Sequence, residues 1–406
     1  MRDAIYMPTT FQVMTKPIGS KCNFNCTYCY YLEKDKLYEG NSSRMDDKTL
    51  ELFIQQYIQT QTSSVINFVW QGGEPTLLGL DYFEKIIAFQ NKYSAGKKIE
   101  NALQTNGSLL RDEWCVFLKQ RDFLVGISID GPLQIHDYYR KTKKNKPTFA
   151  QVMHGIELLH KHDIPFNTLS VVSDFSSKFP LEIYHFLKTI GSGFMQFIPL
   201  VERKRDKQLT NDALSLVLPE EKEASLTSWS VKAENYGNFL IWIFEEWVKK
   251  DVGKTFVQLF DVTLANWVGQ NPGLCVFSEY CGGALVIEHN GDVYSCDHYV
   301  YPEYKLGNIH SEMLVECLNK QEQYQFGLNK KKNLPFVCQN CQFLFACRGE
   351  CPKHRFMVSQ DGTRNLNYLC AAYYRFFKHV QPYMDFMANE LGHNRPPANV
   401  MDFANR

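Results

Sequence analysis

The sequence has no excess of charge of either sign and no long hydrophobic run. Its 44 Lys and Arg residues equal its 44 Asp and Glu residues. This balance excludes a general electrostatic attraction to nucleic acid or to an anionic membrane. No stretch approaches the roughly 20 apolar residues that a membrane-spanning helix needs. The start, MRDAIYMPTTFQVMTKPIG, lacks the apolar core of a signal peptide. We therefore expect a cytoplasmic protein with neither nucleic acid nor membrane as a partner.

Low-complexity tracts are also absent, and the 406 residues are enough for about two or three domains. From about residue 10 to 262, short β-rich runs alternate with longer amphipathic segments, which is typical of βαβ units around a parallel sheet. About six units are too few for a complete barrel of eight. The expected fold is therefore α/β, with a partial, open (β/α)6 barrel. The expected strands are Phe11–Met14, Val65–Trp70, Phe123–Ile129, Asn167–Val172 and Phe194–Pro199, with Phe256–Phe260 as a weaker candidate. The expected helices include Tyr82–Tyr93, Phe149–His162, Leu181–Ile190 and Asn238–Lys249.

The character of the sequence changes past residue 270. The segment 275–370 is rich in cysteine, has little helical periodicity and contains a hairpin candidate at Asn290-Gly291. Periodicity returns in AAYYRFFKHVQPYMDFMANELG, which predicts a C-terminal helix that packs back on the body of the protein. We expect a barrel over residues 1–262, a cysteine-rich domain over 263–380, and a closing helix and tail over 381–406.

Thirteen cysteines are many for a chain expected in the cytoplasm, where thiols stay reduced and disulfides are rare. Eleven of them fall into two groups with short spacings, which favours metal ligation. The other two, Cys115 and Cys317, stand apart within helix-like segments. We expect both to be small buried apolar residues.

The first group, Cys22, Cys26 and Cys29, forms a C-x3-C-x2-C run just past the first expected strand. Active sites of α/β barrels are built at that end of the strands. Three thiolates can hold three irons of a [4Fe–4S] cube and leave the fourth iron open to a small molecule. A zinc site and a partial ferredoxin-type site use similar ligands. The spacing, followed by Tyr30 and Tyr31, resembles the signature of the radical S-adenosylmethionine (SAM) enzymes.

A glycine-rich turn with an acidic residue, Gln71-Gly72-Gly73-Glu74, directly follows the expected strand Val65–Trp70. Its two glycines let the backbone approach a ligand closely, and its carboxylate can pair with an ammonium group. An ordinary strand-to-helix turn with a chance acid is the alternative. Behind the cysteine run, the turn resembles the GGE element by which radical SAM enzymes bind the amino group of the methionine part.

Two further expected strands end in polar segments, Leu103–Gly107 and Ser128–Pro132, and Arg140 follows in HDYYRK. An arginine can clamp a carboxylate in bidentate fashion. Taken singly, such residues are more often caps and turns, but their repeated placement at strand ends favours a shared pocket. The resemblance implies that SAM is bound by Gln71, Gly72, Gly73, Glu74, Ser128 and Arg140.

The second group holds eight cysteines, enough for two sites of four thiolates each. Their order is Cys275-x5-Cys281, then Gly291-x4-Cys296, then a C-x2-C-x5-C-x3-C run of Cys338, Cys341, Cys347 and Cys351, then Cys370. Two zinc sites are one interpretation, since thiolates also suit zinc. Every element of the pattern resembles the SPASM extension of radical SAM peptide-modifying enzymes. That resemblance implies one auxiliary [4Fe–4S] cluster on Cys275, Cys281, Cys296 and Cys351, and another on Cys338, Cys341, Cys347 and Cys370. Four protein ligands leave no open iron, so electron transfer is the expected role.

Together the motifs C-x3-C-x2-C-YY, QGGEPT, QTNG, SIDGP, YSCDHYV and KLGNI and the late cysteines resemble the anaerobic sulfatase-maturating enzymes over nearly the whole chain. The resemblance implies three [4Fe–4S] clusters and SAM as cofactors. A radical derived from SAM would remove hydrogen from Cβ of a Cys or Ser in an unfolded type I sulfatase, which would become Cα-formylglycine. Asp297, directly after Cys296, would be the catalytic base. A low-potential donor such as ferredoxin or flavodoxin is a second expected partner.

Two alternatives stay open. Another SPASM maturase could form thioether or carbon–carbon crosslinks in a ribosomal peptide. Many of those enzymes carry an N-terminal peptide-recognition domain, whereas only 21 residues precede Cys22 here. A multi-cluster electron carrier or a structural zinc protein would cleave no SAM, and it would leave the QGGEP turn without a purpose.

Overall fold

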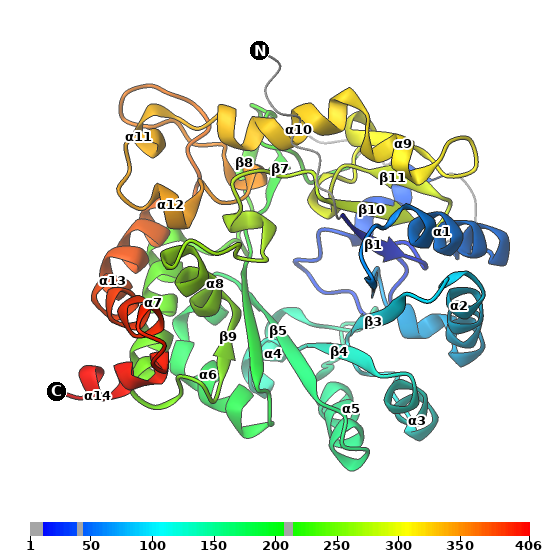
Figure 1. Cartoon of the computed structure of the whole chain (residues 1–406), viewed down its shortest axis with the longest axis horizontal. Helices are drawn as coiled ribbons and strands as arrows, with labels where there is room; N and C mark the ends of the chain where they lie inside the picture. Colours follow the sequence, from blue (N-terminus) through cyan, green and yellow to red (C-terminus); the bar gives the residue numbers. More distant parts are fainter. Residues whose placement is uncertain (1–10, 39–43, 207–213) are drawn as a thin grey trace.

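The computed structural model describes residues 11–38, 44–206 and 214–406, and it builds them around one curved sheet. The strand order is β12-β11-β10-β1-β2-β3-β4-β5-β6-β9. In that order the strands are Lys305–Asn308, Asp292–Tyr294, Ala284–Glu288, Gln12–Lys16, Val65–Trp70, Lys98–Thr105, Phe123–Ser128, Phe166–Val172, Phe194–Pro199 and Phe256–Val257. Figure 1 shows helices arranged around the outside of this sheet.

Strands β1 to β6 run parallel to one another, each paired with its neighbours in sequence order, and β9 continues this parallel part beyond β6. The helices that follow them include α1 (Asp47–Thr60), α2 (Leu80–Tyr93), α3 (Asp112–Gln120), α4 (Leu133–Tyr139), α5 (Phe149–Lys161) and α6 (Pro180–Thr189). Their buried apolar faces pack on the sheet, and aromatic side chains such as Phe53, Trp70 and Phe83 fill the space between. The prediction of a partial, open (β/α)6 barrel is confirmed.

The cysteine-rich segment extends the same sheet. Strand β10 pairs in parallel with β1 over five residues, from Gln12 opposite Ala284 to Lys16 opposite Glu288. Strands β11 and β12 then continue the sheet in antiparallel fashion. The hairpin predicted at Asn290-Gly291 is present between β10 and β11, and Gly291 has a φ of 86°, which glycine adopts without strain.

The C-terminal helix α13 (Cys370–Gly392) packs on α7 (Ala233–Lys250), as the periodicity predicted. The two helices approach closely at Gly237, where an added Cβ would lie 3.1 Å from Cα of Ala372. Helix α13 runs through residue 380 without a break, and α14 (Val400–Ala404) also packs on α7. Among the described residues, no helix combines the length and apolar character needed to cross a membrane.

Two features of the later segments differ from the sequence prediction. Only Phe256–Val257 of the weak strand candidate is a strand, because helix α8 (Gln258–Trp267) begins directly after it and buries Leu259, Phe260 and Thr263. The cysteine-rich segment also contains the 12-residue helix α10 (Gln321–Lys332). Its sequence shows little apolar periodicity because its buried residues are Gln323, Gly327 and Lys330.

The remaining elements are short. They are helices α9 (Leu314–Leu318), α11 (Phe336–Gln339) and α12 (Leu344–Cys347), strands β7 (Arg203–Arg205) and β8 (Ala224–Leu226), and 3-10 helices η1 (Leu32–Leu37), η2 (Pro75–Leu78), η3 (Ser176–Lys178), η4 (Cys275–Phe277), η5 (Asp297–Tyr299), η6 (Pro302–Tyr304), η7 (Pro352–His354) and η8 (Pro397–Asn399).

Gly155 in α5 provides a test of how tightly the barrel is packed. An added Cβ would lie 2.2 Å from the carbonyl oxygen of Gly107, in the turn after β3. Alanine favours a helix interior by about 1 kcal/mol over glycine, but this overlap should destabilise by about 1–3 kcal/mol instead. We expect Gly155→Ala to lower the melting temperature by a few degrees in calorimetry. Gly392→Ala in α13, where a Cβ meets nothing within 4 Å, is the control and should leave it unchanged or slightly higher. A Gly155→Ala protein as stable as the wild type would contradict this packing.

Candidate active site

The loop after β1 carries Cys22, Cys26 and Cys29, and all three thiols are free and partly accessible. The three side chains lie close together, because the charge of Cys29 contributes to raising the pKa of both Cys22 and Cys26. Burial raises the pKa of Cys22 and of Cys26 to about 12 each. The metal-free thiols therefore keep their protons at neutral pH, and binding of a metal cluster has to displace them.

The two glycines after β2 let this cysteine loop lie directly against the end of the sheet. The Gly73 amide donates to the Gly19 carbonyl at 2.8 Å, and the Glu74 amide donates to the Lys21 carbonyl at 3.0 Å. A Cβ on Gly73 would lie 2.0 Å from the Lys21 carbonyl oxygen, and Gly72 has a φ of 143°. Any side chain at position 73 would therefore push the cysteine loop away from the strand ends.

Glu74 is fully buried, and its carboxylate connects the ends of two strands. Oε1 accepts hydrogen bonds from the Thr76 amide and hydroxyl and from the Thr105 hydroxyl, and Oε2 accepts one from the Asn106 amide. Burial raises the pKa of Glu74. Asn106 in turn donates to the Asn23 side chain in the cysteine loop. The predicted SAM-binding carboxylate thus also holds the QGGE turn, the QTNG turn and the cysteine loop together.

Arg140, at the end of α4, lies next to the cysteine loop and is buried. It forms a bidentate ion pair with Asp130, with Nε–Oδ2 at 2.9 Å and Nη2–Oδ1 at 3.1 Å. The Tyr28 hydroxyl also donates to Asp130, at 2.6 Å. The carboxylate that Arg140 clamps in the structure is therefore that of Asp130, and its assignment to SAM stays a prediction. Ser128 ends β4 at the same edge of the sheet and is partly exposed.

The eight later cysteines gather into two groups. Burial and Glu350 raise the pKa of Cys351, and so do the neighbouring charges of Cys281, Cys296 and Cys275. Burial also raises the pKa of Cys338, Cys347 and Cys370, and the charges of neighbouring cysteines raise it further. The cysteines that act on one another in this way are Cys338, Cys341, Cys347 and Cys370. These neighbours are compatible with the two sets of four that the resemblance implied, and the assignment of each set to a cluster stays a prediction. The two isolated cysteines, Cys115 and Cys317, are fully buried, as predicted.

The backbone between Cys347 and Cys351 explains why two cysteines so close in sequence join different groups. Arg348, Gly349 and Glu350 all have left-handed conformations, with φ of 50°, 69° and 51°. Because residues other than glycine rarely adopt this conformation, three in a row form an unusual turn between the two cysteines. The Glu350 side chain, which accepts hydrogen bonds from Asn367 and binds His354, helps to hold this turn.

Asp297 lies between the cysteine loop and the first of these two groups. Its Oδ1 is 2.6 Å from Nζ of Lys16 at the end of β1, and its Oδ2 accepts a hydrogen bond from the Tyr30 hydroxyl. Burial would raise the pKa of Asp297, but the charge of Lys16 and these contacts hold it below its ordinary value. These contacts keep the carboxylate charged, and 16% of the Asp297 side chain as a whole is exposed, whereas Oδ1 itself is buried against Lys16. The next residue, His298, lies 3.5 Å from Sγ of Cys351.

Lys16 and three tyrosines in and directly after the cysteine run belong to the site but were not predicted from the sequence as site residues. Tyr28, Tyr30 and Tyr31 donate their hydroxyls to Asp130, Asp297 and Glu288 respectively. The available signal was the residue type itself. Tyrosine rather than phenylalanine at buried positions indicates that each hydroxyl has a partner.

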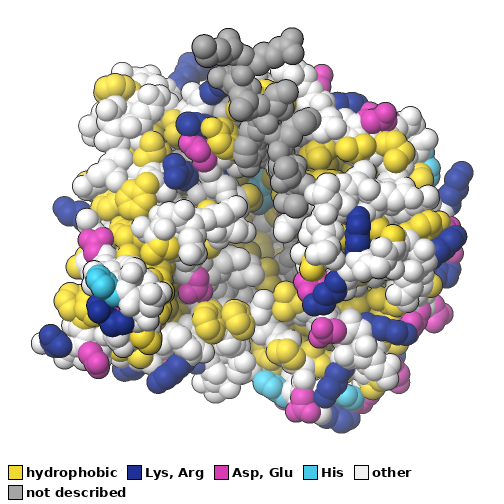
Figure 2. Space-filling model, in the orientation of Figure 1, with side chains coloured by type: hydrophobic (Ala, Val, Ile, Leu, Met, Phe, Trp, Pro, Cys, Tyr) yellow, Lys and Arg dark blue, Asp and Glu magenta, His cyan; other side chains and the backbone are white. Residues whose placement is uncertain are grey.

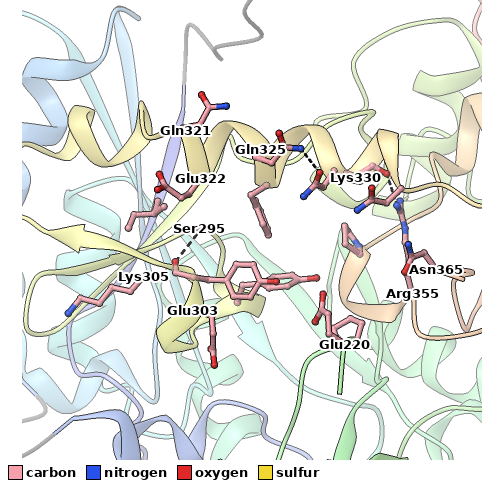
Figure 3. A pocket seen from close by; sticks show the side chains of 18 residues that line it. Glu220, Ser295, Glu303, Lys305, Gln321, Glu322, Gln325, Lys330, Arg355 and Asn365 are labelled. Atoms are coloured by element: carbon pink, nitrogen blue, oxygen red, sulfur yellow. Dashed lines mark hydrogen bonds between the residues drawn. The ribbon is translucent and has the colours of Figure 1, made fainter. Parts of the chain in front are cut away.

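A cavity of about 470 Å³ adjoins the first of the later cysteine groups. Its lining includes Ser295 and Pro352, the neighbours in sequence of Cys296 and Cys351, together with Tyr299 and Phe326. Buried Lys330 also contributes to it and donates to the carbonyl of Cys275 at 2.5 Å. Figure 3 shows Glu220, Glu303 and Lys305 around this space. None of the three N-terminal cysteines lines it, so it is separate from the site around Asp297.

Comparison with known families agrees with this geometry. The model of the radical SAM superfamily matches residues 17–183, which include the cysteine loop and the strand ends beside it. The model of an iron-sulfur cluster-binding domain, SPASM, matches residues 275–342, which include Asp297 and five of the later cysteines.

Proteins similar to this chain are known over its full length. A serine-type anaerobic sulfatase-maturating enzyme of Bacteroides thetaiotaomicron is 51% identical over 99% of this chain and 97% of its own. A cysteine-type enzyme of Clostridium novyi is 31% identical, with 95% and 99% covered. The solved structure of native anSMEcpe with bound AdoMet and Cp18Cys peptide superimposes with a TM-score of 0.81 at 30% identity, covering 94% of this chain and 99% of that one. This chain therefore belongs to the family of anaerobic sulfatase-maturating enzymes within the radical SAM superfamily.

Proposed function

We propose that this protein oxidises a Ser or Cys side chain in an unfolded type I sulfatase to Cα-formylglycine without using oxygen. The observation that carries the proposal is the position of Asp297, which follows Cys296 and contacts Tyr30 of the N-terminal cysteine loop. A base at that point lies between the N-terminal cysteine loop and the first of the later cysteine groups. Serine is the favoured target, because the relative at 51% identity is serine-type and the cysteine-type relative is 31% identical.

The residues of this chain fit the cofactors of the family, which are SAM and three [4Fe–4S] clusters. Cys22, Cys26 and Cys29 would hold the SAM-binding cluster, and the two groups of four would hold the auxiliary clusters. Support comes from their free thiols and their spatial grouping. When bound, these cofactors supply the one-electron chemistry that protein side chains lack. Gln71 to Glu74, Ser128 and Arg140 would bind SAM, and the close backbone approach at Gly73 keeps that turn beside the cysteine loop.

The task of Asp297 is to accept the proton from Oγ or Sγ of the substrate residue. Lys16 keeps its carboxylate ionised, and the Tyr30 hydroxyl fixes the orientation of the second oxygen. The hydrogen bonds of Glu74 and Asp130 hold the surrounding loops rigid, so the reacting groups are positioned before the substrate arrives. Figure 2 shows that the molecule is hollowed near the middle of this face, which offers an entry for an extended polypeptide.

Three further assignments complete the proposal. The chain would be divided into a radical SAM barrel over residues 1–262, a SPASM domain over 263–380 and a closing helix and tail over 381–406. The enzyme would act in the cytoplasm, before its sulfatase substrate folds. A low-potential protein such as ferredoxin or flavodoxin would supply its electrons.

The direct test of function uses anaerobically reconstituted protein with SAM, dithionite and a sulfatase-derived peptide that contains Ser or Cys. We expect 5′-deoxyadenosine together with a loss of about 2 Da from the Ser peptide or about 18 Da from the Cys peptide, which mass spectrometry detects. The Ser peptide should react at least as fast as the Cys peptide. Deoxyadenosine formed with both peptides unchanged would contradict the assignment of the substrate, and no deoxyadenosine from cluster-loaded protein would contradict radical chemistry altogether.

Asp297→Asn tests the base. The amide cannot accept the substrate proton, so the yield of aldehyde should fall by about 10²-fold or more, while deoxyadenosine still forms. Asp251→Asn is the matched control, because Asp251 is also a buried aspartate that binds a lysine and a tyrosine, Lys188 and Tyr184. It should retain the wild-type yield. A full yield of aldehyde from Asp297→Asn would remove this residue from the mechanism.

Iron content tests the grouping of the later cysteines. Cys275→Ala and Cys351→Ala should each lose one cluster, about four irons per chain, and combining them should cost no more than either alone. Combining Cys338→Ala with Cys351→Ala should instead lose about eight irons. Cys115→Ala, at an isolated buried cysteine, should keep the full complement. Equal iron loss from the two combined variants would contradict the grouping.

A further inference from the structure

Lys16 is a buried lysine whose contacts all lie at the proposed reaction centre. Its side chain is 1% exposed at the end of β1. Nζ lies 2.6 Å from Oδ1 of Asp297 and donates to Oε1 of Gln71 at 3.1 Å. It also lies 4.5 Å from the centre of the Tyr31 ring, at a distance where a cation is attracted to an aromatic face.

A charge in this position is costly for the fold. Removing an ammonium group from water is strongly unfavourable, and an apolar residue of similar length would fill the end of β1 without that cost. The ion pair with Asp297 compensates only if the geometry is good, so each member of the pair fixes the position of the other. The two contacts of Nζ also join separate segments, because Gln71 begins the predicted SAM-binding turn and Asp297 follows the hairpin of β10 and β11.

We propose that Lys16 is a positioning residue for formylglycine formation. Its ammonium group fixes the Asp297 carboxylate relative to the Gln71 turn. The base and the cofactor would then both lie next to the same substrate side chain. The inference rests on the function proposed above. Lys16 itself acts through Asp297 and needs no contact with the peptide.

A similar set of contacts joins α6 to the end of α7, although its lysine is 32% exposed and Lys16 is 1% exposed. Lys188 in α6 pairs with Asp251 at 2.7 Å, Tyr184 donates to Asp251 at 2.7 Å, and Nζ of Lys188 lies 5.4 Å from the Tyr184 ring. Replacing Lys188 therefore removes a lysine from a similar set of contacts without touching Asp297. It separates an effect at the reaction centre from the general effect of breaking a lysine–aspartate pair.

The experiment compares Lys16→Met with Lys188→Met in the assay with SAM, dithionite and the Ser peptide. The quantity measured is the ratio of aldehyde to deoxyadenosine, together with kcat and KM for the peptide. Lys16→Met should lower the ratio and kcat at least about tenfold, with KM within about threefold, since a positioning residue acts on the reaction and not on peptide binding. Lys188→Met should keep the wild-type ratio. An unchanged ratio in Lys16→Met would overturn the proposal.

The double variant Lys16→Met with Asp297→Asn tests whether Lys16 acts through Asp297. It leaves no unpaired buried charge, so it also serves if Lys16→Met alone fails to load its clusters. We expect its ratio to equal that of Asp297→Asn within about threefold, because coupled residues are not additive. A further tenfold loss would mean an independent role and would overturn the proposal. If the wild type forms no aldehyde, the proposed function fails; if it does and Lys16→Met matches it, only the role of Lys16 fails.

Discussion

The parallel pairing of β10 with β1 is the interaction on which the geometry of the site depends. The two strands align over five residues, and Lys16 at the end of β1 lies opposite Glu288 at the end of β10. The hairpin that follows β10 then leads back to Cys296 and Asp297. Because a shift by one residue would turn every side chain of β10 to the other face of the sheet, this register decides whether Asp297 meets Lys16. One sheet thus carries both the N-terminal cysteine loop and the carboxylate beside the first later group.

The site is also held by two buried carboxylates other than the proposed base Asp297. Glu74 accepts four hydrogen bonds from two strand ends, and Asp130 receives Arg140 and Tyr28. Buried charges of this kind are stable only when their partners are all in place. Each therefore ties its loops together far more strictly than apolar packing would, and the cysteine loop is held against the strand ends by groups on three segments. The missing side chain of Gly73 allows the loop to approach this closely, and the hydrogen bonds then keep it there.

Separation of the later cysteines depends on backbone conformation as well as on side chains. Left-handed residues 348–350 turn the chain between Cys347 and Cys351, and buried Lys330 binds the carbonyls of Cys275 and Val276. Helix α10, which carries Lys330, is thus fixed by polar contacts with the first group and by the packing of Phe326 on Tyr299 and Tyr304. Its buried residues are Gln323, Gly327 and Lys330. This arrangement explains why a helix with weak periodicity is nevertheless ordered. It also leaves Asp297 and His298 as the residues between that group and the N-terminal loop.

Sequence alone determined the fold class, the family and the candidate cysteines. Strands such as Val65–Trp70 were predicted to the residue, since alternation of strands and helices is a local property that periodicity records. The motif Cys-Asp after the hairpin likewise named Asp297. Tertiary structure alone decided the neighbours of Asp297: Lys16 and Tyr30 are 281 and 267 residues away in the chain, counted from their numbers, and no local pattern links them. The meeting of Lys16 with Asp297 follows from the register of β1 with β10, and strand register across such a separation is set by packing of the whole sheet.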